Sequence, residues 1–453
     1  MTRTSSDIGA GLAPAREPRP ISAGERIHVI GAGGAGASAA ALLAHSAGAT
    51  VTGCDIGGPS PYTAALVAAA IHLDWAHDPA HVADDNGRGA PLIDRLAVTK
   101  ALTSVAPDHP ELLAARRAGV PVESWQQLVA DAAATTGQRL VAIAGTHGKS
   151  TSSGWLVHVL VEAGGDPSAF VGALLPGLLT GGLPSTARLG SGDVFVVEAD
   201  EYAGNFDAYR PSLAVLLNAE WDHPDVFGDE SAVIDAFEAW LRLPGAEQRT
   251  VIVNASDRGA ALVSGRLTDW PGQIVDVGDE QLATGIRLSG GHNLTNARCV
   301  AAAARELGVP EAAIDSGIAS YGGVGRRMEV KGEVGGVTVI DDYAHHPTAI
   351  AATLQAVRDT HPDKRIWAVY EPLTFHRTAA MLDAFADVLA TADHAVIADI
   401  WAGRDPDTTI TSPAALADAV SRRASQTATA PGSVEATAAH LLERVGPGDV
   451  VLV

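Results

Sequence analysis

Cysteine is almost absent from this sequence. Cys54 and Cys299 are the only two among 453 residues. Two isolated cysteines form neither a disulfide framework nor a spaced set of zinc ligands. We therefore expect both to be small, buried core residues.

Positive charge is also scarce. Lysine and arginine number 31 against 53 acidic residues, which gives a formal net charge of −22. A chain without a basic field releases few counterions from nucleic acid, so nucleic acid is excluded as the main partner.

Long apolar runs are missing too. No run is long enough to span a bilayer, and residues 1–24 lack the apolar core of a signal peptide. We therefore expect a cytoplasmic protein without a membrane partner, and a disordered leader over residues 1–24.

The strongest motif present is Gly-Thr-His-Gly-Lys-Ser-Thr at residues 145–151. It follows the apolar run 140–144 and precedes a helical pattern, which is the context of a phosphate-binding loop. The strict pattern G-x-x-x-x-G-K-[ST] is not met, so a glycine-rich turn with a surface lysine is the alternative. In a phosphate loop, Lys149 would neutralise phosphate oxygens and Ser150 would place its hydroxyl on Mg²⁺.

A second glycine loop lies near the start. The strand signal 26–30 leads into Gly31-Ala-Gly33-Gly34-Ala-Gly36 and an alanine-rich helix. About twenty residues on, Asp55 ends another predicted strand and is placed to hold a ribose. This pattern predicts a nucleotide-binding crossover, but nothing in it selects nicotinamide.

Carboxylates and amides follow other predicted strands and turns. The buried run 193–198 ends on Glu198, and His223 lies among carboxylates after the strand 212–217. Both could hold a divalent metal. Glu198 could equally be a helix cap or a carboxylate in a loop, and most of the 16 histidines must be ordinary surface or core residues. Asn293 and Asn296 share one helix face, where Asn293 could instead be an N-cap.

In order, the motifs GTHGKST, EADE, NAEWDHPD, GGHNLTNA, GRRMEV and DDYAHHPTAI resemble those of the Mur ligase family over nearly the whole chain after Arg26. The resemblance implies an α/β fold of three domains: a Rossmann-like UDP-sugar domain (25–137), a central P-loop ATPase-like domain (138–324) and a C-terminal Rossmann-like domain (325–453). The run Gly322–Gly325 would be a hinge that closes the last domain onto ATP.

The function implied is an ADP-forming ligase of peptidoglycan precursor synthesis. It would join L-alanine to the lactyl carboxylate of UDP-N-acetylmuramate through an acyl phosphate, with ATP and Mg²⁺ as cofactors. Its partners would be these small molecules, and the chain would be a monomer or weak homodimer.

The resemblance also implies roles for residues. Catalysis would rest on Lys149, His223 and Arg327, and the metal on Ser150, Glu198 and His223. The remaining contacts would be to ATP from Gly145, Thr146, His147, Gly148, Lys149, Ser150, Thr151, Asn293, Asn296, Arg327 and Asp342, to the UDP substrate from Gly31, Gly33, Gly34, Gly36 and Asp55, and to the amino acid from His345, His346, His376 and Arg377.

Two departures keep alternatives open. The run Tyr370–Thr378 partly resembles ligases that recycle a murein tripeptide, so either that reaction or a related ligation in another pathway is possible. The chain stops at Val453, where family members continue into a further turn, and this motivates a weaker alternative, a non-catalytic nucleotide-binding regulator. A dehydrogenase is weaker still, because it leaves Lys149, Glu198 and His223 unexplained.

Overall fold

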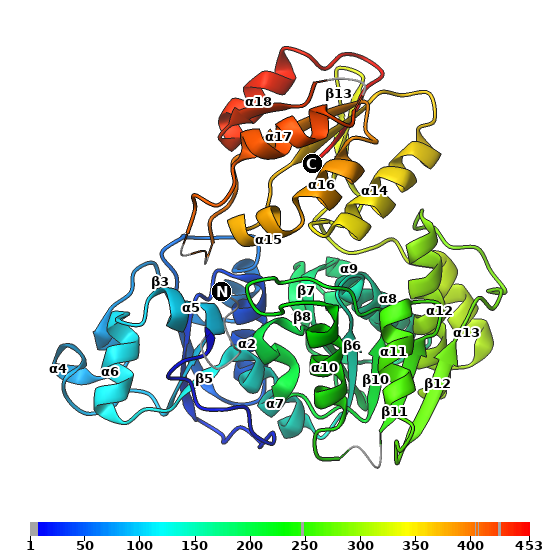
Figure 1. The fold of residues 1–453 in the computed structure, drawn as a ribbon. Coiled ribbons are helices and arrows are strands. Elements are labelled where there is room, and N and C mark those ends of the chain that lie inside the picture. Colours follow the sequence, from blue (N-terminus) through cyan, green and yellow to red (C-terminus); the bar gives the residue numbers. More distant parts are fainter. Residues whose placement is uncertain (1–7, 246–248, 404, 406, 425–426) are drawn as a thin grey trace.

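The computed structural model describes residues 8–245, 249–403, 405, 407–424 and 427–453. Three sheets follow one another along the chain, and Figure 1 shows the first (blue to cyan) beside the second (green), with the third (yellow to red) above them. The predicted α/β architecture of three units is confirmed. Within these residues, no helix is both long and apolar enough to cross a membrane.

The first sheet is parallel throughout. Its strands are β1 (Arg26–Ile30), β2 (Thr50–Cys54), β3 (His72–Asp74), β4 (Arg95–Val98) and β5 (Val122–Ser124), in the order β3-β2-β1-β4-β5. Its helices are α2 (Ala35–Ser46), α3 (Ala64–Ala68), the 3₁₀ turn η1 (Pro79–His81), α4 (Asp84–Gly87), α5 (Lys100–Val105), α6 (Pro110–Ala118) and α7 (Trp125–Thr136). From β1 the chain adds β2 and β3 on one side of the sheet and then β4 and β5 on the other. Parallel sheets of this type bind ligands at that switch point, between β1 and β4.

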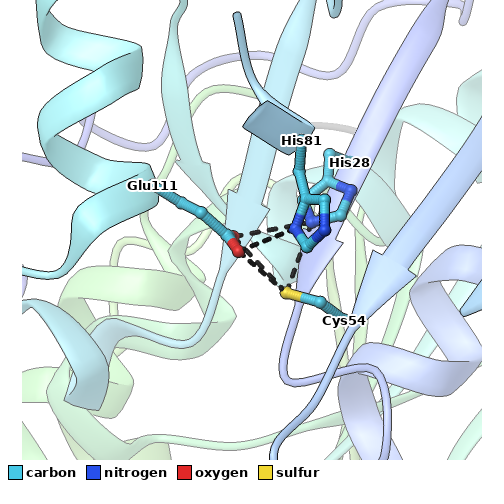
Figure 2. Close-up of side chains that lie close together, drawn as sticks. All are labelled: His28, Cys54, His81 and Glu111. Carbon is cyan, nitrogen blue, oxygen red and sulfur yellow. Dashed lines mark hydrogen bonds and ion pairs between the residues drawn. The ribbon is translucent and has the colours of Figure 1, made fainter. Parts of the chain in front are cut away.

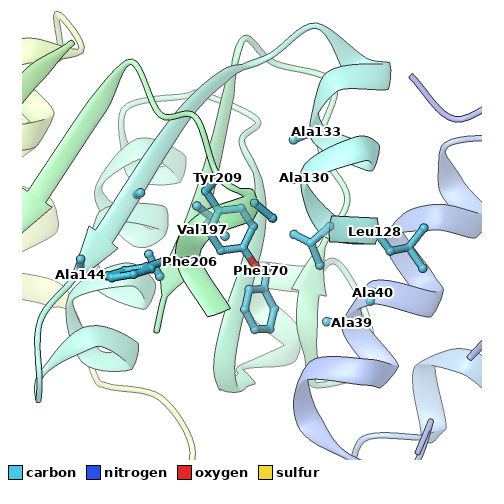
Figure 3. Close-up of a cluster of buried hydrophobic side chains, with 14 of the residues drawn as sticks. Ala39, Ala40, Leu128, Ala130, Ala133, Ala144, Phe170, Val197, Phe206 and Tyr209 are labelled. Carbon is cyan, nitrogen blue, oxygen red and sulfur yellow. The ribbon is translucent and has the colours of Figure 1, made fainter. Parts of the chain in front are cut away.

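Helix α2 packs closely because six of its eight buried residues are alanine or serine. A Cβ on Gly36 would lie 2.3 Å from the Trp125 ring, so glycine is required in the first turn. Trp125 in turn meets Phe170 of the second sheet edge-on, with ring centroids 5.2 Å apart. Figure 3 shows Phe170 beside Ala39 and Ala40 of α2, so the first two sheets share one hydrophobic core.

The predicted disordered leader makes contacts with the folded units, although most of its described side chains are exposed. Ile8 is buried, and the Arg16 guanidinium donates hydrogen bonds to Glu123 at 3.1 Å and to Asp131 at 2.7 Å. Composition alone predicts disorder because it does not reveal that Arg16 has partners more than 100 positions away. Residues 1–7 of the predicted leader lie outside the described residues.

The second sheet is parallel except where its edge strand pairs antiparallel with its neighbour. Its strands are β6 (Arg139–Ala144), β7 (Ser168–Leu175), β8 (Ser185–Arg188), β9 (Val194–Ala199), β10 (Leu213–Leu216), β11 (Thr250–Asn254) and β12 (Gln273–Val277), in the order β12-β11-β10-β6-β9-β7-β8. Its helices are α8 (Lys149–Glu162), α9 (Gly177–Thr180), the 3₁₀ element η2 (Tyr202–Ala208), α10 (Glu230–Leu241), α11 (Arg258–Arg266), α12 (Gly291–Glu306) and α13 (Glu311–Ser320). Because β9, β6 and β10 are parallel neighbours, the loops after them meet at one edge.

The third sheet is parallel apart from its first strand, which forms an antiparallel hairpin. Its strands are β13 (Glu329–Val334), β14 (Val337–Asp341), β15 (Ile366–Tyr370), β16 (His394–Ala398), β17 (Thr429–Gly432) and β18 (Val450–Leu452), in the order β13-β14-β18-β15-β16-β17. Its helices are α14 (Pro347–Thr360), α15 (Phe375–Ala380), α16 (Leu382–Leu389), α17 (Pro413–Ser421) and α18 (Val434–Leu442). Figure 1 shows α15 at the lower side of this unit, facing the other two.

Candidate functional site

A glycine loop joins β6 to α8 and borders a cavity of about 320 Å³. Gly145 has φ +147° and Gly148 has φ +81°, a region that favours glycine. A Cβ on Gly148 would also lie 2.9 Å from the Asn296 side chain. The backbone amide of His147 donates to Asn218 Oδ1 at 2.9 Å, which fixes the loop to the residue that follows β10. All of residues 146–151 line the cavity, so the start of α8 faces it, and the N-terminus of a helix suits an anion.

Lys149 is directed onto protein oxygens at this loop. Its Nζ donates to the Gly145 carbonyl at 2.6 Å and to Glu201 Oε2 at 2.8 Å, and it lies 3.6 Å from Asp200 Oδ1. Burial alone would lower the pKa of Lys149, but Glu201 and Asp200 outweigh it and raise that pKa. The cavity therefore contains a fixed positive charge that phosphate oxygens could share.

A candidate cation site adjoins Lys149. One donor atom from each of Asp200, Glu201 and His223 lies within 4.8 Å of the others. Burial raises the pKa of Glu201 to about 7, and Glu201 Oε1 has no hydrogen-bond partner among the described residues. A buried carboxylate oxygen without a partner is stabilised by a nearby cation, so these donors fit a divalent ion such as Mg²⁺.

This arrangement differs from the predicted metal set of Ser150, Glu198 and His223. Glu198 does line the same cavity, but its Oε2 accepts a hydrogen bond from the Gly172 amide at 2.7 Å. Asp200 and Glu201 are candidate ligands that the sequence interpretation did not name, although the Glu-Ala-Asp-Glu run at residues 198–201 contains them.

Asn293 and Asn296 both line the cavity from the first turns of α12. The helix begins at Gly291 after a Gly290 cap, so the alternative that Asn293 is the N-cap is wrong. The Asn293 side chain instead donates from Nδ2 to the Ser289 carbonyl at 2.8 Å, and its Oδ1 accepts from Asn296 Nδ2 at 3.5 Å. These contacts hold both amides at the cavity wall.

The third unit contributes Arg327 and Asp342 to the same cavity. Arg327 Nη2 lies 3.4 Å from Ser150 Oγ, and its guanidinium lies over the Tyr343 ring at 5.3 Å from the centroid. The Asp342 carboxylate accepts from the amides of Met328 at 2.7 Å and Ala344 at 2.8 Å. The structure thus brings Arg327 to the glycine loop of residues 145–151, whereas Asp342 fixes the turn that contains Met328.

Arg377 joins the third unit to the second. It donates to both oxygens of Asp222, at 2.7 and 3.0 Å, and lies 3.2 Å from His223 Nδ1. Arg377 and Asp222 are both buried. His223 has φ +53°, which is uncommon for a side chain without a functional or structural constraint.

Of the predicted amino-acid contacts, His345 and His346 line the cavity, whereas His376 and Arg377 contact carboxylates of the protein. His345 lines the cavity, and burial lowers its pKa well below the ordinary value, so it is neutral near pH 7. His346 also lines the cavity, but its Nε2 donates to the Trp221 carbonyl at 3.1 Å and its Nδ1 accepts from the Thr348 amide at 3.3 Å. His376 lies 3.0 Å from Asp405 Oδ1. Both ring nitrogens of His346 are thus used in structural contacts.

The backbone amides of the first glycine loop, residues 31–34, already donate hydrogen bonds to acceptors within the protein. The amides of Gly31 and Ala32 donate to the Cys54 carbonyl, that of Gly33 to Asp55 at 3.0 Å, and that of Gly34 to the Gly31 carbonyl. Asp55 also accepts from the Gly57 amide at 2.7 Å. Residues 31–34 therefore do not present free amides to a diphosphate, and a ligand here would meet the start of α2 instead.

A second cavity of about 820 Å³ lies where the three units meet. The first unit contributes Ala35 and Tyr62, the second residues 172–176, and the third residues 326–331. Gly172, Arg327 and Tyr343 line both cavities, so the two spaces adjoin. A ligand in the larger space would extend from the first unit to Arg327, next to the glycine loop of residues 145–151.

Three family models match this chain in the same order as its sheets. They are "Mur ligase family, catalytic domain" over residues 26–136, "Mur ligase middle domain" over 143–288 and "Mur ligase, glutamate ligase domain" over 326–453.

Individual proteins agree with these matches. A UDP-N-acetylmuramate–L-alanine ligase of Kineococcus radiotolerans is 39% identical, with 94% of each chain covered. The structure of a UDP-N-acetylmuramate–alanine ligase from Thermotoga maritima is 25% identical with a TM-score of 0.72, covering 94% of each chain. A murein peptide ligase from Psychrobacter arcticus, 24% identical with a TM-score of 0.69 over 95% of each chain, shares the fold. The chain belongs to the Mur ligase family.

Proposed function

We propose that this protein is an ATP-dependent ligase that forms an amide between L-alanine and the lactyl carboxylate of UDP-N-acetylmuramate. The observation that carries the proposal is the convergence of Lys149, Ser150 and Arg327 at one cavity, from two units of a chain that is 39% identical to a ligase of that name.

ATP would lie with its triphosphate against residues 145–151. Lys149 would exchange Glu201 for phosphate oxygens, and Arg327 would approach the γ-phosphate beside Ser150. Mg²⁺, when bound at Asp200, Glu201 and His223, would offset negative charge on the phosphates. Asn293 and Asn296 would contact the nucleotide from α12, where Asn296 lies beside Gly148.

The sugar nucleotide would occupy the larger cavity, with its UDP end toward the start of α2 and its carboxylate toward Arg327. A carboxylate oxygen attacks the γ-phosphorus as the bond to the β-phosphate oxygen breaks, giving an acyl phosphate and ADP. The alanine amine, once deprotonated, then attacks the acyl carbon and phosphate leaves. His345 is a neutral imidazole that lines the cavity and is the group we assign to the amine side.

The test is ADP release with ATP, Mg²⁺ and UDP-N-acetylmuramate in the presence of single amino acids. We expect release with L-alanine and little with glycine, L-serine or D-alanine. Turnover with L-alanyl-γ-D-glutamyl-meso-diaminopimelate and not with L-alanine would establish the recycling reaction instead. The absence of ADP release with every acceptor would contradict both ligase assignments and favour a nucleotide-binding regulator.

A further inference from the structure

A second cluster of metal-binding side chains lies in the first unit, away from the ATP cavity. It consists of His28 in β1, Cys54 at the end of β2, His81 in η1 and Glu111 in the first turn of α6. Figure 2 shows the four side chains pointing toward one another from these separate elements. The sequence suggested only a core role for Cys54, because its neighbours in space are dispersed over more than 80 positions.

The distances within this cluster suit tetrahedral coordination. Metal–ligand bonds of about 2.0–2.3 Å place tetrahedral ligands roughly 3.3–3.8 Å apart. His28 Nε2 lies 3.3 Å from Cys54 Sγ and 3.5 Å from Glu111 Oε2, and Cys54 Sγ lies 3.3 Å from Glu111 Oε1. His81 Nδ1 is 2.9 Å from Glu111 Oε1. All four donor atoms lie within 4.8 Å of one another, so small shifts would accommodate one ion.

The outward nitrogens of both histidines have oxygen partners, as metal-bound histidines usually do. His28 Nδ1 lies 2.8 Å from Thr52 Oγ1, and His81 Nε2 lies 3.4 Å from Asp74 Oδ2. These contacts favour the tautomers that direct His28 Nε2 and His81 Nδ1 inward as lone-pair donors.

Charge provides a second reason for a cation. Glu111 is fully buried, and the ion-pair partners that the structure gives it are His28, His77 and His81. A buried carboxylate without a permanent positive partner is costly. The alternative is a purely hydrogen-bonded network, in which the Cys54 thiol donates to Glu111 and His77 Nδ1 lies 3.2 Å from the sulfur.

We propose that His28, Cys54, His81 and Glu111 bind one structural Zn²⁺ ion. A thiolate, two imidazoles and a carboxylate form a donor set typical of zinc. Binding releases the Cys54 proton to solvent, and the 2+ charge then balances one thiolate and one carboxylate.

The position of this site gives it a structural role. The Cys54 carbonyl accepts the amides of Gly31 and Ala32, and the next residue, Asp55, accepts that of Gly33. An ion held by Cys54 would therefore fix the end of β2 and, through it, the loop that leads into α2. Zinc would also tie η1 and α6 to the sheet.

The test uses the full chain without a histidine tag, incubated with Zn²⁺ and excess Mg²⁺ and then desalted. We expect about one zinc per chain by elemental analysis. With Co²⁺ in place of Zn²⁺, we expect a thiolate-to-cobalt charge-transfer band in the near ultraviolet. Because the chain has two cysteines, Cys299→Ser is a matched control that keeps both signals, whereas Cys54→Ser loses both.

Two further measurements guard against misfolding of Cys54→Ser and against zinc at the ATP cavity. Glu111→Gln keeps the side-chain shape and should bind zinc more weakly, whereas His223→Ala should retain the zinc. Chelation should lower the Tm of the wild type and of Cys299→Ser. Wild-type protein that retains no zinc, or a cobalt complex without the charge-transfer band, would overturn the proposal in favour of the hydrogen-bonded network.

Discussion

Arg377 of the third sheet's unit and Asp222 of the second form a buried, two-pronged ion pair, with N–O distances of 2.7 and 3.0 Å. Burial alone would raise the pKa of Asp222, but His223 and Arg377 outweigh it and hold that pKa well below its usual range. The pair therefore carries full opposite charges. Because its partners belong to different units, it forms only when the third unit is docked on the second.

Replacing Arg377 by alanine should disrupt this seating. Removing one partner of a buried ion pair typically costs about 3–5 kcal/mol, because the other charge is left unpaired. We expect ADP release to fall by about 100-fold or more, since each factor of ten corresponds to about 1.4 kcal/mol. A double-mutant cycle with Asp222→Ala should show strong non-additivity.

The control for this cycle is Arg358→Ala. Arg358 pairs with Asp393 at 2.6 Å within the third unit, and both side chains are about one-third exposed. Its loss should change turnover little. Equal effects of the two arginine substitutions would contradict a specific role for the contact between units.

Lys149→Ala should reduce ADP release by about 10²–10³-fold, the usual effect of removing one electrostatic donor from a transition state. The reason is that Lys149 is the charged group held at the loop by Glu201 and the Gly145 carbonyl. Lys364→Ala, on a turn of the third unit, is the matched control and should leave the rate unchanged. An active Lys149→Ala enzyme would show that the loop does not hold the transferring phosphate.

The sequence predicted those parts of the site that are local in the chain. The strand, glycine loop and helix around Lys149 are contiguous, so a short motif was enough to place them. The pairing of Asp222 with Arg377 spans 155 positions and depends on how two sheets dock, which no local pattern encodes. Cys54 was interpreted as an ordinary core residue for the same reason, because its three neighbours in the cluster come from three other elements.

The leader offers a test of order that the sequence did not predict. Arg16 donates to Asp131, which is fully buried and also pairs with Arg95. We expect Arg16→Ala to lower the free energy of unfolding by about 1.5–3 kcal/mol, the range for hydrogen bonds to charged groups. Arg26→Ala removes a largely exposed pair with Asp94 in the same unit and should cost less than about 1 kcal/mol.

The effect of Arg16→Ala should depend on pH. Burial alone would raise the pKa of Asp131, but hydrogen bonds from Arg16, the Arg19 amide and Arg95 lower it overall. A lowered pKa in the folded state contributes stability above the unfolded pKa of about 4, and that stability is lost as the pH falls further. The Tm difference between wild type and variant should therefore be full at pH 7 and shrink below about pH 4. A difference that is the same at both pH values would contradict the charged pairing.

The connection between the second and third units can be tested with two adjacent glycines. Gly323 has φ +97°, which strains any other residue, whereas Gly322 lies in open space without a positive φ. We expect Gly323→Ala to cost about 1–3 kcal/mol of local strain and to lower turnover more than ATP affinity, because the residues that follow include Arg327. Gly322→Ala should leave both unchanged.

Proline is unsuitable at Gly325, because the Gly325 amide donates to the Leu174 carbonyl at 3.0 Å. Since Arg327 reaches Ser150 only at 3.4 Å, even a small rotation at Gly323 should separate the two groups, and equal kinetics for the two alanine variants would show that this connection does not set their distance.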